Sequence, residues 1–231
     1  MYLADPLSQG WYDHDWPLLP EIVELQKSRL RIGATVFDIG AHHGVVAAML
    51  AMQVGPFGRV IAVEASRHNY LVALKNRDLN GLNQIEVVHA AIADQSGTLM
   101  FNEGLNGQLD DGTGAGGRVL VKALTLDELA GKYGLPDVVF IDVEGAEHLA
   151  LSGGRRLLGS DTDFFVEVHV GCGLEKLGGS VADVLSYFPK DRFDLLVRAE
   201  ADSEFRPLEP HDPLINQRFF LIARRKYNSC E

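Results

Sequence analysis

The sequence predicts an α/β protein with a mostly parallel sheet and helices on both faces, and three observations support this prediction. Short β-rich runs alternate with helical patterns along most of the chain. The runs are apolar nearly throughout, as in strands that are buried on both faces of a parallel sheet. The chain has 231 residues, of which 46% are hydrophobic and 23% charged, so it is long enough for one sizeable core.

The order of the elements follows from this alternation. Because crossovers between parallel strands are right-handed, the carboxyl ends of the strands meet at one edge, where open sheets bind ligands. Two late apolar runs, Phe193–Val197 and Phe219–Ala223, have no clear helix between them and are interpreted as an antiparallel pair at the end of the sheet. The other expected strands are Val36–Ile39, Val60–Val63, Ile85–His89, Val138–Ile141 and Phe164–Val168, and the expected helices are Val45–Val54, Asn69–Asn80, Leu126–Tyr133 and Ala146–Leu158.

Two segments fall outside the alternation. Residues 1–33 form an N-terminal segment that is rich in aromatic side chains and in which a helix is predicted from about Leu18, so we separate them from a main domain of residues 34–231. The glycine-rich residues 102–118 lie between two short apolar runs, which predicts a hairpin with a long loop. Loops of this length are often functional.

Composition excludes several classes of protein. The net charge of −11 disfavours nucleic acid as a partner, because phosphate backbones are held by clustered Lys and Arg. The longest apolar run, Val45–Met52, is too short to span a membrane, and the first residues lack the pattern of a secretory signal. Cys172 and Cys230 fit free thiols in a reducing cytosol, so a cytoplasmic location is expected. The sequence does not indicate an oligomeric state.

The stretch "VFDIGAHHG" is a strand followed by a glycine turn and a helix, which is typical of nucleotide-like cofactor sites. Gly40 and Gly44 lack the middle glycine of the dinucleotide fingerprint, and the chain has no phosphate-binding loop. Glu64 ends the second strand, where an acid accepts hydrogen bonds from ribose hydroxyls. Asp38 ends the first strand, close to a ligand's positive end. Ribose, no pyrophosphate and a cationic group together describe S-adenosylmethionine.

The chain also resembles a known family. The segments "VFDIGAHHG", "VIAVEAS", "VVHAAIAD", "TLDEL", "VVFIDVEGAEHLALSGG" and "FFVEVH" have the order and spacing of the FkbM family of S-adenosylmethionine-dependent methyltransferases, and "RFFLIARRK" extends the similarity. The acidic turn within "IDVEGAEHLALSGG" is the most specific of them. The resemblance implies the class I methyltransferase Rossmann-like fold, with a seven-stranded sheet whose last strand is antiparallel. It also implies methyl transfer, usually to oxygen.

The resemblance assigns roles to residues of this chain. Asp38, Gly40 and Gly44 look like the glycine turn that holds the cofactor, and Glu64 like its ribose partner. The family has Asn where this chain has His42, which is expected near the amino-acid end of the cofactor. The segment from Ala91 and Ile92 to Asp94 resembles the one that lines the adenine. Asp142 is expected beside the methyl donor and acceptor.

A hydroxyl acceptor needs a base to take its proton, and three candidates lie at the carboxyl edge of the sheet. His169 is preferred because its unperturbed pKa lies near operating pH, so we expect activity to follow one ionisation in the neutral range. Glu144 and Glu147 are the other two candidates for the base. Asp142, beside the methyl donor and acceptor, completes the predicted catalytic set with His169 and Glu144. Glu147 is interpreted first as a helix-end charge, and His169 has a structural interpretation too. Asp142 with His169 could bind a divalent ion, but Mg²⁺ prefers oxygen ligands and no metal is predicted.

The sequence narrows the methyl acceptor. After the fourth strand it reads Asp142-Val143-Glu144-Gly145, which differs from the Asn/Asp-Pro-Pro-aromatic turn of enzymes that methylate base amino groups, and neither cysteine follows a proline. A hydroxyl of a sugar, lipid or polyketide-type metabolite is therefore the leading acceptor. The N-terminal aromatic residues Trp11, Tyr12 and Trp16 either cover this acceptor or anchor their segment on the core. Two other functions stay open, a nicotinamide-dependent oxidoreductase and a non-catalytic cofactor-binding protein.

Overall fold

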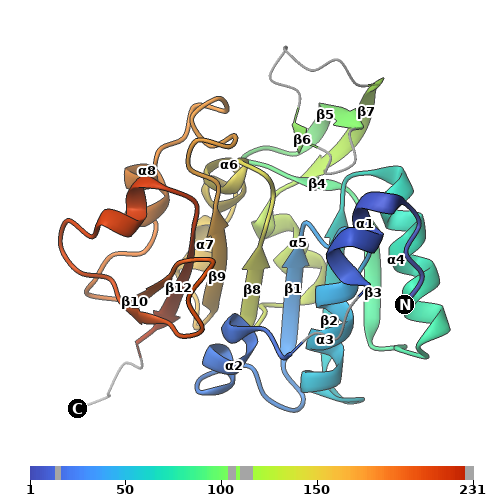
Figure 1. Cartoon of the computed structure of the whole chain (residues 1–231), viewed down its shortest axis with the longest axis horizontal. Helices are drawn as coiled ribbons and strands as arrows, with labels where there is room; N and C mark the ends of the chain where they lie inside the picture. The colour runs from blue at the N-terminus through green and yellow to red at the C-terminus, as the bar shows by residue number, and fades with distance from the viewer. Residues whose placement is uncertain (14–16, 104–107, 110–116, 227–231) are drawn as a thin grey trace.

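The computed structural model describes residues 1–13, 17–103, 108–109 and 117–226, and a large sheet forms its centre (Figure 1). The strand order is β11-β10-β12-β9-β8-β1-β2-β3, in which β3, β2, β1, β8 and β9 are mutually parallel. β12 is antiparallel to both of its neighbours. The strands are β1 (Thr35–Ile39), β2 (Arg59–Glu64), β3 (Ile85–His89), β8 (Val138–Ile141), β9 (Asp163–Val168), β10 (Phe193–Arg198), β11 (Arg206–Pro207) and β12 (Phe219–Arg225).

The predicted fold class is confirmed, with one addition to the sheet. The five expected parallel strands occur within two residues of their predicted bounds, and the two late runs form the antiparallel pair β10 and β12. β12 lies inside the sheet between β9 and β10, so the last strand is the antiparallel one. The two-residue β11 pairs with β10 and makes an eighth strand at the edge, beyond the seven that were predicted.

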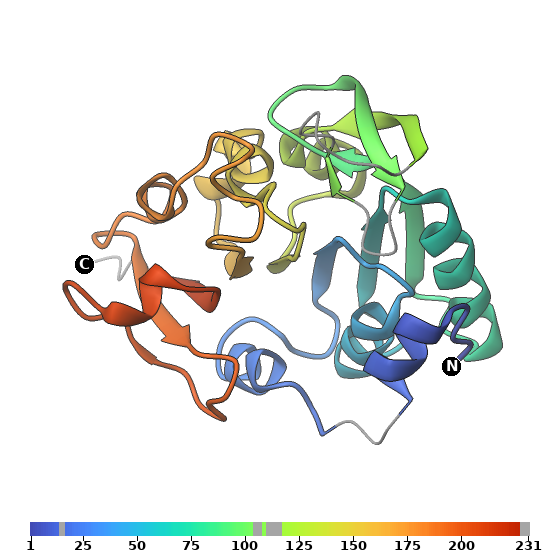
Figure 2. The same cartoon turned by 45° about the horizontal axis from the view of Figure 1, so that its top comes forward.

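A second sheet stands over the carboxyl ends of the main strands (Figures 1 and 2). Its order is β4-β7-β5-β6, and β5 and β7 form the predicted antiparallel hairpin, with Phe101 opposite Val119. Most of the glycine-rich loop that was predicted between them lies outside the described residues. The strands are β4 (Ala91–Ile92), β5 (Gly97–Glu103), β6 (Gln108–Leu109) and β7 (Gly117–Leu124).

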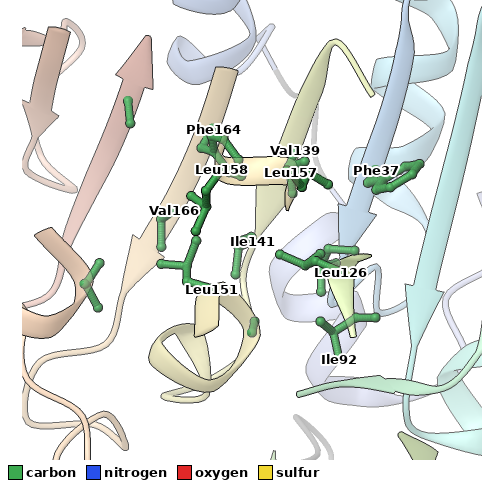
Figure 3. Close-up of a cluster of buried hydrophobic side chains, with 14 of the residues drawn as sticks. Phe37, Ile92, Leu126, Val139, Ile141, Leu151, Leu157, Leu158, Phe164 and Val166 are labelled. Carbon is green, nitrogen blue, oxygen red and sulfur yellow. The ribbon is translucent and has the colours of Figure 1, made fainter. Parts of the chain in front are cut away.

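Helices cover both faces of the main sheet, as predicted. The side-chain period of a strand is two, so neighbouring residues of β1 enter different cores. Val36 packs with α2 and α3 on one face, and Phe37 packs with α5, α6 and α7 on the other (Figure 3). The helices are α1 (Pro6–Tyr12), α2 (Pro20–Gln26), α3 (Val45–Val54), α4 (Arg67–Leu79), α5 (Leu126–Tyr133), α6 (Glu147–Ser152), α7 (Arg155–Leu158), α8 (Val181–Ser186) and the 3-10 helix η1 (Pro213–Asn216).

The structure corrects the helix prediction in two places. The single helix that was expected over Ala146–Leu158 is divided into α6 and α7 at Gly153, where a Cβ atom would lie 2.3 Å from the Ala93 carbonyl oxygen. The short helices α1 and α8 were not predicted. Each begins with a side-chain cap, since Asp5 accepts from the Ser8 N–H and Ser180 from the Asp183 N–H.

The N-terminal residues do not form a separate core. Ile22 and Leu25 of α2 are fully buried in the same cluster as Val36 of β1. α1 lies beside α4, whereas α2 lies below β1 at the amino end of the strand (Figure 1). The division into a cap of residues 1–33 and a domain of residues 34–231 therefore stays a proposal.

Candidate functional site

The turn after β1 brings two strand ends into close contact. Gly40 has φ +90°, and a Cβ atom on it would lie 1.8 Å from the Asp142 carbonyl oxygen at the end of β8. Gly44 has φ +76° and precedes α3, where a Cβ atom would lie 3.2 Å from the Ala73 Cβ of α4. Both positions therefore require glycine, which alone adopts positive φ without steric cost. A ligand at this edge would meet backbone rather than side chains.

Glu64 and Asp38 face this turn from the ends of β2 and β1. The Glu64 carboxylate accepts from the backbone N–H of His42 at 2.8 Å and from that of Ser66 at 2.7 Å. Burial raises the pKa of Glu64 to about 7, although these N–H groups act in the opposite direction. Burial and the neighbouring Glu64 raise the pKa of Asp38 to about 7, too. Asp38 Oδ2 is buried without a hydrogen-bond partner in the described part of the chain.

A narrow cavity lies between the glycine turn and the second sheet. It measures about 50 Å³, and its wall includes four of the predicted cofactor residues: Gly40, Glu64, Ala91 and Ile92. Phe101 of β5 closes it from the hairpin, a residue that the sequence did not single out. Small-molecule sites measure roughly 300–1,000 Å³, so binding a nucleoside requires this wall to open. Four further predicted cofactor residues lie outside the wall: Asp38 in β1, and His42, Gly44 and Asp142 on the adjoining turns.

The acidic turn after β8 has an unusual backbone. Glu144 has φ +51°, and Gly145 has φ +104°. A Cβ atom on Gly145 would lie 2.4 Å from the Gly173 carbonyl carbon, so the turn packs directly on the loop that follows β9. A non-glycine residue at positive φ costs about 1–3 kcal/mol and is often found at functional sites. The backbone therefore supports the prediction that this turn is part of the site.

His169 directly follows β9, and several carboxylates at this edge of the sheet surround its imidazole. Its Nδ1 is 2.8 Å from Glu147 Oε1. Burial lowers the pKa of His169, but the hydrogen bond with Glu147 and the surrounding carboxylates outweigh burial and raise it to about 9. In this arrangement, the imidazole therefore loses its proton at a higher pH than the neutral range expected from the sequence. Nε2 faces three further carboxylates, at 3.7 Å from Asp142 Oδ1, 3.6 Å from Glu144 Oε2 and 3.4 Å from Glu167 Oε1.

Glu147 holds this cluster in place. It is fully buried, and its Oε1 accepts from the Gly145 N–H at 2.8 Å as well as contacting His169. The helix-end interpretation is thus compatible with a second role, orienting the imidazole. Burial, followed by the nearby Glu167, raises the pKa of Asp142. Glu167 in turn pairs with Arg218. The two residues lie in the quoted segments "FFVEVH" and "RFFLIARRK", but the sequence analysis gave them no role, because only the pairing of β9 with β12 brings them together.

The predicted catalytic residues are also compatible with metal binding. The ligand atoms of Asp142, Glu144 and His169 all lie within 4.8 Å of one another. Glu147 binds the other imidazole nitrogen, as an outer carboxylate often does for a metal-bound histidine. The prediction that no metal takes part stays untested.

The N-terminal aromatic residues lie over the glycine turn. The Tyr12 hydroxyl is 3.3 Å from His42 Nδ1, and the Trp11 and His42 ring centres are 5.8 Å apart. Burial, followed by Asp142 and the carboxylates near it, raises the pKa of Tyr12. The described part of the segment thus covers the predicted cofactor turn, and Trp16 lies outside the described residues. Tyr12 was noted in the sequence only as an aromatic residue, because no motif linked it to His42.

The sequence of this site matches a family model. The model of the methyltransferase FkbM domain matches residues 38–195, which is more than half of the chain. The chain belongs to this family. The match begins at Asp38 and includes the glycine turn, the acidic turn and His169, so the resemblance in the sequence is confirmed.

Solved structures of methyltransferases share the fold at low sequence identity. The FkbM methyltransferase of Methylobacillus flagellatus is 18% identical over 82% of this chain, with a TM-score of 0.51, and this chain covers 43% of that longer protein. The S-adenosylmethionine-dependent O-methyltransferase of Thermotoga maritima is 14% identical over 99% of this chain and 73% of its own, with a TM-score of 0.53. The precorrin-6y C5,15-methyltransferase of Geobacter metallireducens is 16% identical over 87% and 86%, with a TM-score of 0.52.

These structures show that the chain has a methyltransferase fold, but they do not show which atom accepts the methyl group. They include O-methyltransferase and C5,15-methyltransferase enzymes, so the fold does not decide between oxygen and carbon. No curated protein matches the chain in sequence. Within the described ranges, no helix is long and apolar enough to cross a bilayer.

Proposed function

We propose that this FkbM-family protein transfers a methyl group from S-adenosylmethionine to a hydroxyl oxygen of a small molecule. The observation that supports this proposal best is that two clusters of acidic side chains lie at the same edge of the sheet. Glu64 and Asp38 lie at the glycine turn, and the cluster around His169 lies beyond the adjoining turn, which contacts Gly40 through Asp142. A cofactor bound by Glu64 and Asp38 would thus direct its methyl group toward the cluster around His169.

The residues at the glycine turn fit the cofactor chemically. Each Glu64 oxygen accepts one backbone N–H and keeps a lone pair for a ribose hydroxyl. Asp38 Oδ2 lacks a donor among the described residues, and the ammonium group of the cofactor is a donor of the right charge. Gly40 has no side chain where the backbone must approach a ligand.

The cluster around His169 fits the acceptor. Bound S-adenosylmethionine supplies a methyl group on an activated sulfonium, so most of the work left to the protein is alignment, which can contribute roughly 7–11 kcal/mol. In its neutral form, His169 takes the proton from the acceptor hydroxyl through Nε2, which faces the site. Glu144 and Asp142 stabilise the imidazolium that results.

The acceptor is proposed to be a sugar, lipid or polyketide-type metabolite. A net charge of −11 and a site with Asp142, Glu144 and Glu167 within 4 Å of one imidazole nitrogen repel polyanions such as nucleic acid. The exposed free thiol of Cys172 fits the reducing cytosol as its compartment. Membership in a methyltransferase family speaks against the nicotinamide-dependent oxidoreductase.

Equilibrium binding tests the cofactor assignment. S-adenosylhomocysteine should bind and raise the melting temperature, whereas NAD and ATP should not. Glu64→Gln keeps the size of the side chain but removes the charged acceptor, and hydrogen bonds to charged groups contribute about 1.5–3 kcal/mol. Calorimetry should therefore show binding weakened by about 10- to 150-fold.

Glu209→Gln is the matched control, because Glu209 is exposed on a distant loop and should bind as the wild type does. Equal affinity for wild type and Glu64→Gln would contradict the ribose assignment. Turnover is then tested by incubating the protein with S-adenosylmethionine and fractionated small-molecule extracts and measuring the S-adenosylhomocysteine that is released. Tight binding of the product with no release in any hydroxyl-containing fraction would favour the non-catalytic alternative.

A further inference from the structure

His43 is a buried histidine that the proposed methyl transfer does not use. Its side chain is fully buried, and neither of its imidazole nitrogens makes a hydrogen bond within the described residues. Asn76 donates to the His43 carbonyl oxygen at 2.8 Å and thereby fixes its backbone against α4. A buried polar group without a hydrogen-bond partner is costly, so the imidazole requires an explanation.

Two further side chains converge on His43 from other segments. Asp5 Oδ2 lies 3.4 Å from His43 Nε2 and 3.9 Å from His68 Nε2, and the ligand atoms of all three residues lie within 4.8 Å of one another. Asp5 caps α1 through its other oxygen, which accepts from the Ser8 N–H at 2.8 Å. Its Oδ2 is therefore directed to the two imidazoles.

The spacing of these atoms is close to that of a metal site. Four ligands around Zn²⁺ at about 2.0–2.1 Å in tetrahedral geometry lie about 3.3 Å from one another. The Asp5–His43 distance already matches this value, and the exposed His68 side chain needs only a small rotation to reach it. A histidine binds a metal through the lone pair of a neutral imidazole nitrogen, and neither nitrogen of His43 is engaged in a hydrogen bond within the described residues.

We propose that Asp5, His43 and His68 bind one divalent transition-metal ion, with water as the fourth ligand. Two imidazoles and a carboxylate suit ions such as Zn²⁺, Co²⁺ and Fe²⁺, whereas Mg²⁺ prefers oxygen ligands. This site shares no residue with the cluster around His169 and lies on the cofactor side of the edge.

The ion would join three segments that are distant in sequence. Asp5 belongs to the start of α1, His43 to the glycine turn, and His68 to the first turn of α4. The other end of α1 places Tyr12 against His42. Metal binding therefore fixes α1 across the glycine turn, and it does so without a bound cofactor.

Titration with Zn²⁺ tests the site in the full chain. After treatment with EDTA and its removal, wild-type protein should bind one equivalent at this site, and Co²⁺ should give the visible absorption of a tetrahedral complex. His68 is 57% exposed in its side chain, so His68→Asn should fold normally yet lose at least about 100-fold in affinity. His211→Asn is the matched control, because His211 is exposed on another loop at φ +60°, which Asn tolerates.

Asp5→Asn provides a second test, because Asn keeps the helix cap but removes the anionic ligand. Tryptophan fluorescence adds a readout of α1, since the only two tryptophans of the chain, Trp11 and Trp16, belong to the N-terminal residues. Zn²⁺ should reduce acrylamide quenching in wild type and in His211→Asn but not in His68→Asn.

Three results would overturn the proposal. One is the absence of Zn²⁺ binding by wild type at micromolar concentration. Another is binding that His68→Asn and Asp5→Asn leave unchanged. The third is binding that is lost in His169→Gln alone, which would place the ion at the acceptor cluster instead. None of these measurements uses a cofactor or an acceptor, so they are independent of the proposed methyl transfer.

Discussion

His43 and His169 are both buried near the carboxyl edge of the same sheet, yet their pKa values shift in opposite directions. Burial lowers the pKa of His43 despite the nearby Asp5 carboxylate. In His169 the effect of burial is outweighed, and the pKa is raised to about 9. The difference lies in the number of carboxylates, because among the described residues four lie within 4 Å of His169 and one lies within that distance of His43.

The comparison separates two kinds of chemistry at one edge. An imidazole with a single carboxylate beside it is suited to donate a lone pair to a metal. An imidazole among several carboxylates holds a proton and returns to the neutral form only at high pH or when the cluster is rearranged. The same residue type thus serves two proposed sites because the surrounding charges differ.

The largest expected effect tests His169 as the base. His169→Gln keeps polarity and approximate size but cannot titrate, so methyl transfer should fall by about 10²–10⁴-fold while S-adenosylhomocysteine still binds. In wild type, the rate should rise with pH toward about 9, because the base must be neutral. Rates with the most active extract fraction, measured from pH 6 to 10, check both statements.

Glu144→Gln is the control for this experiment. It removes a carboxylate near His169 Nε2 but leaves the imidazole, so the rate should fall less and the ionisation should remain. Addition of EDTA tests the metal alternative at Asp142, Glu144 and His169. Full activity of His169→Gln with an unchanged pH profile would remove His169 from the mechanism.

A smaller effect is expected for Glu147, which acts through His169 as a positioning residue. The hydrogen bond with Glu147 is the main contribution that raises the pKa of His169. Glu147→Gln should therefore shift the midpoint of the pH–rate profile downward by about 1–3 units, the usual effect of one close charge. A purely structural role for Glu147 would lower the rate at every pH and leave the midpoint where it was.

The fold could be predicted from the sequence because its signals are local. The apolar run at Val138–Ile141 and the helical pattern at Leu126–Tyr133 specify their elements without help from distant residues, and the structure has both with the predicted bounds. The division of α6 from α7 could not be predicted in this way. The break lies at Gly153, which approaches the Ala93 carbonyl too closely for a side chain, and only the folded chain brings these two residues together.

The site was predictable only where a motif or a strand end marked it. Glu64 and Asp38 end strands, and the structure places them together at the glycine turn. Asp5 belongs to no motif, and Glu167 lies in the segment "FFVEVH" without a predicted role. Their importance comes from tertiary neighbours, which are His43 for Asp5 and Arg218 for Glu167. The direction of a pKa shift depends on such neighbours as well. The sequence alone therefore predicted a neutral-range ionisation of His169, whereas the carboxylates around it raise its pKa to about 9.

The smallest expected effect concerns stability. It tests, without any ligand, the difference in surrounding carboxylates between His169 and His43. His169 has a pKa of about 9 in the folded protein and about 6.5 in an unfolded chain, so the folded state holds its proton more tightly. The stability that this adds is complete below pH 6.5 and is lost as the pH rises through 9. Loss on the order of 1–3 kcal/mol lowers the melting temperature by several degrees in a chain of this size.

The measurement is the melting temperature as a function of pH between pH 6 and 10. This temperature should decrease less with rising pH for His169→Gln than for wild type. His43→Gln should keep the wild-type slope above about pH 8, because the pKa of His43 is lowered and its effect on stability is confined to pH values near and below its unfolded value of about 6.5. Equal slopes for all three proteins would show that the carboxylates do not hold a proton on His169.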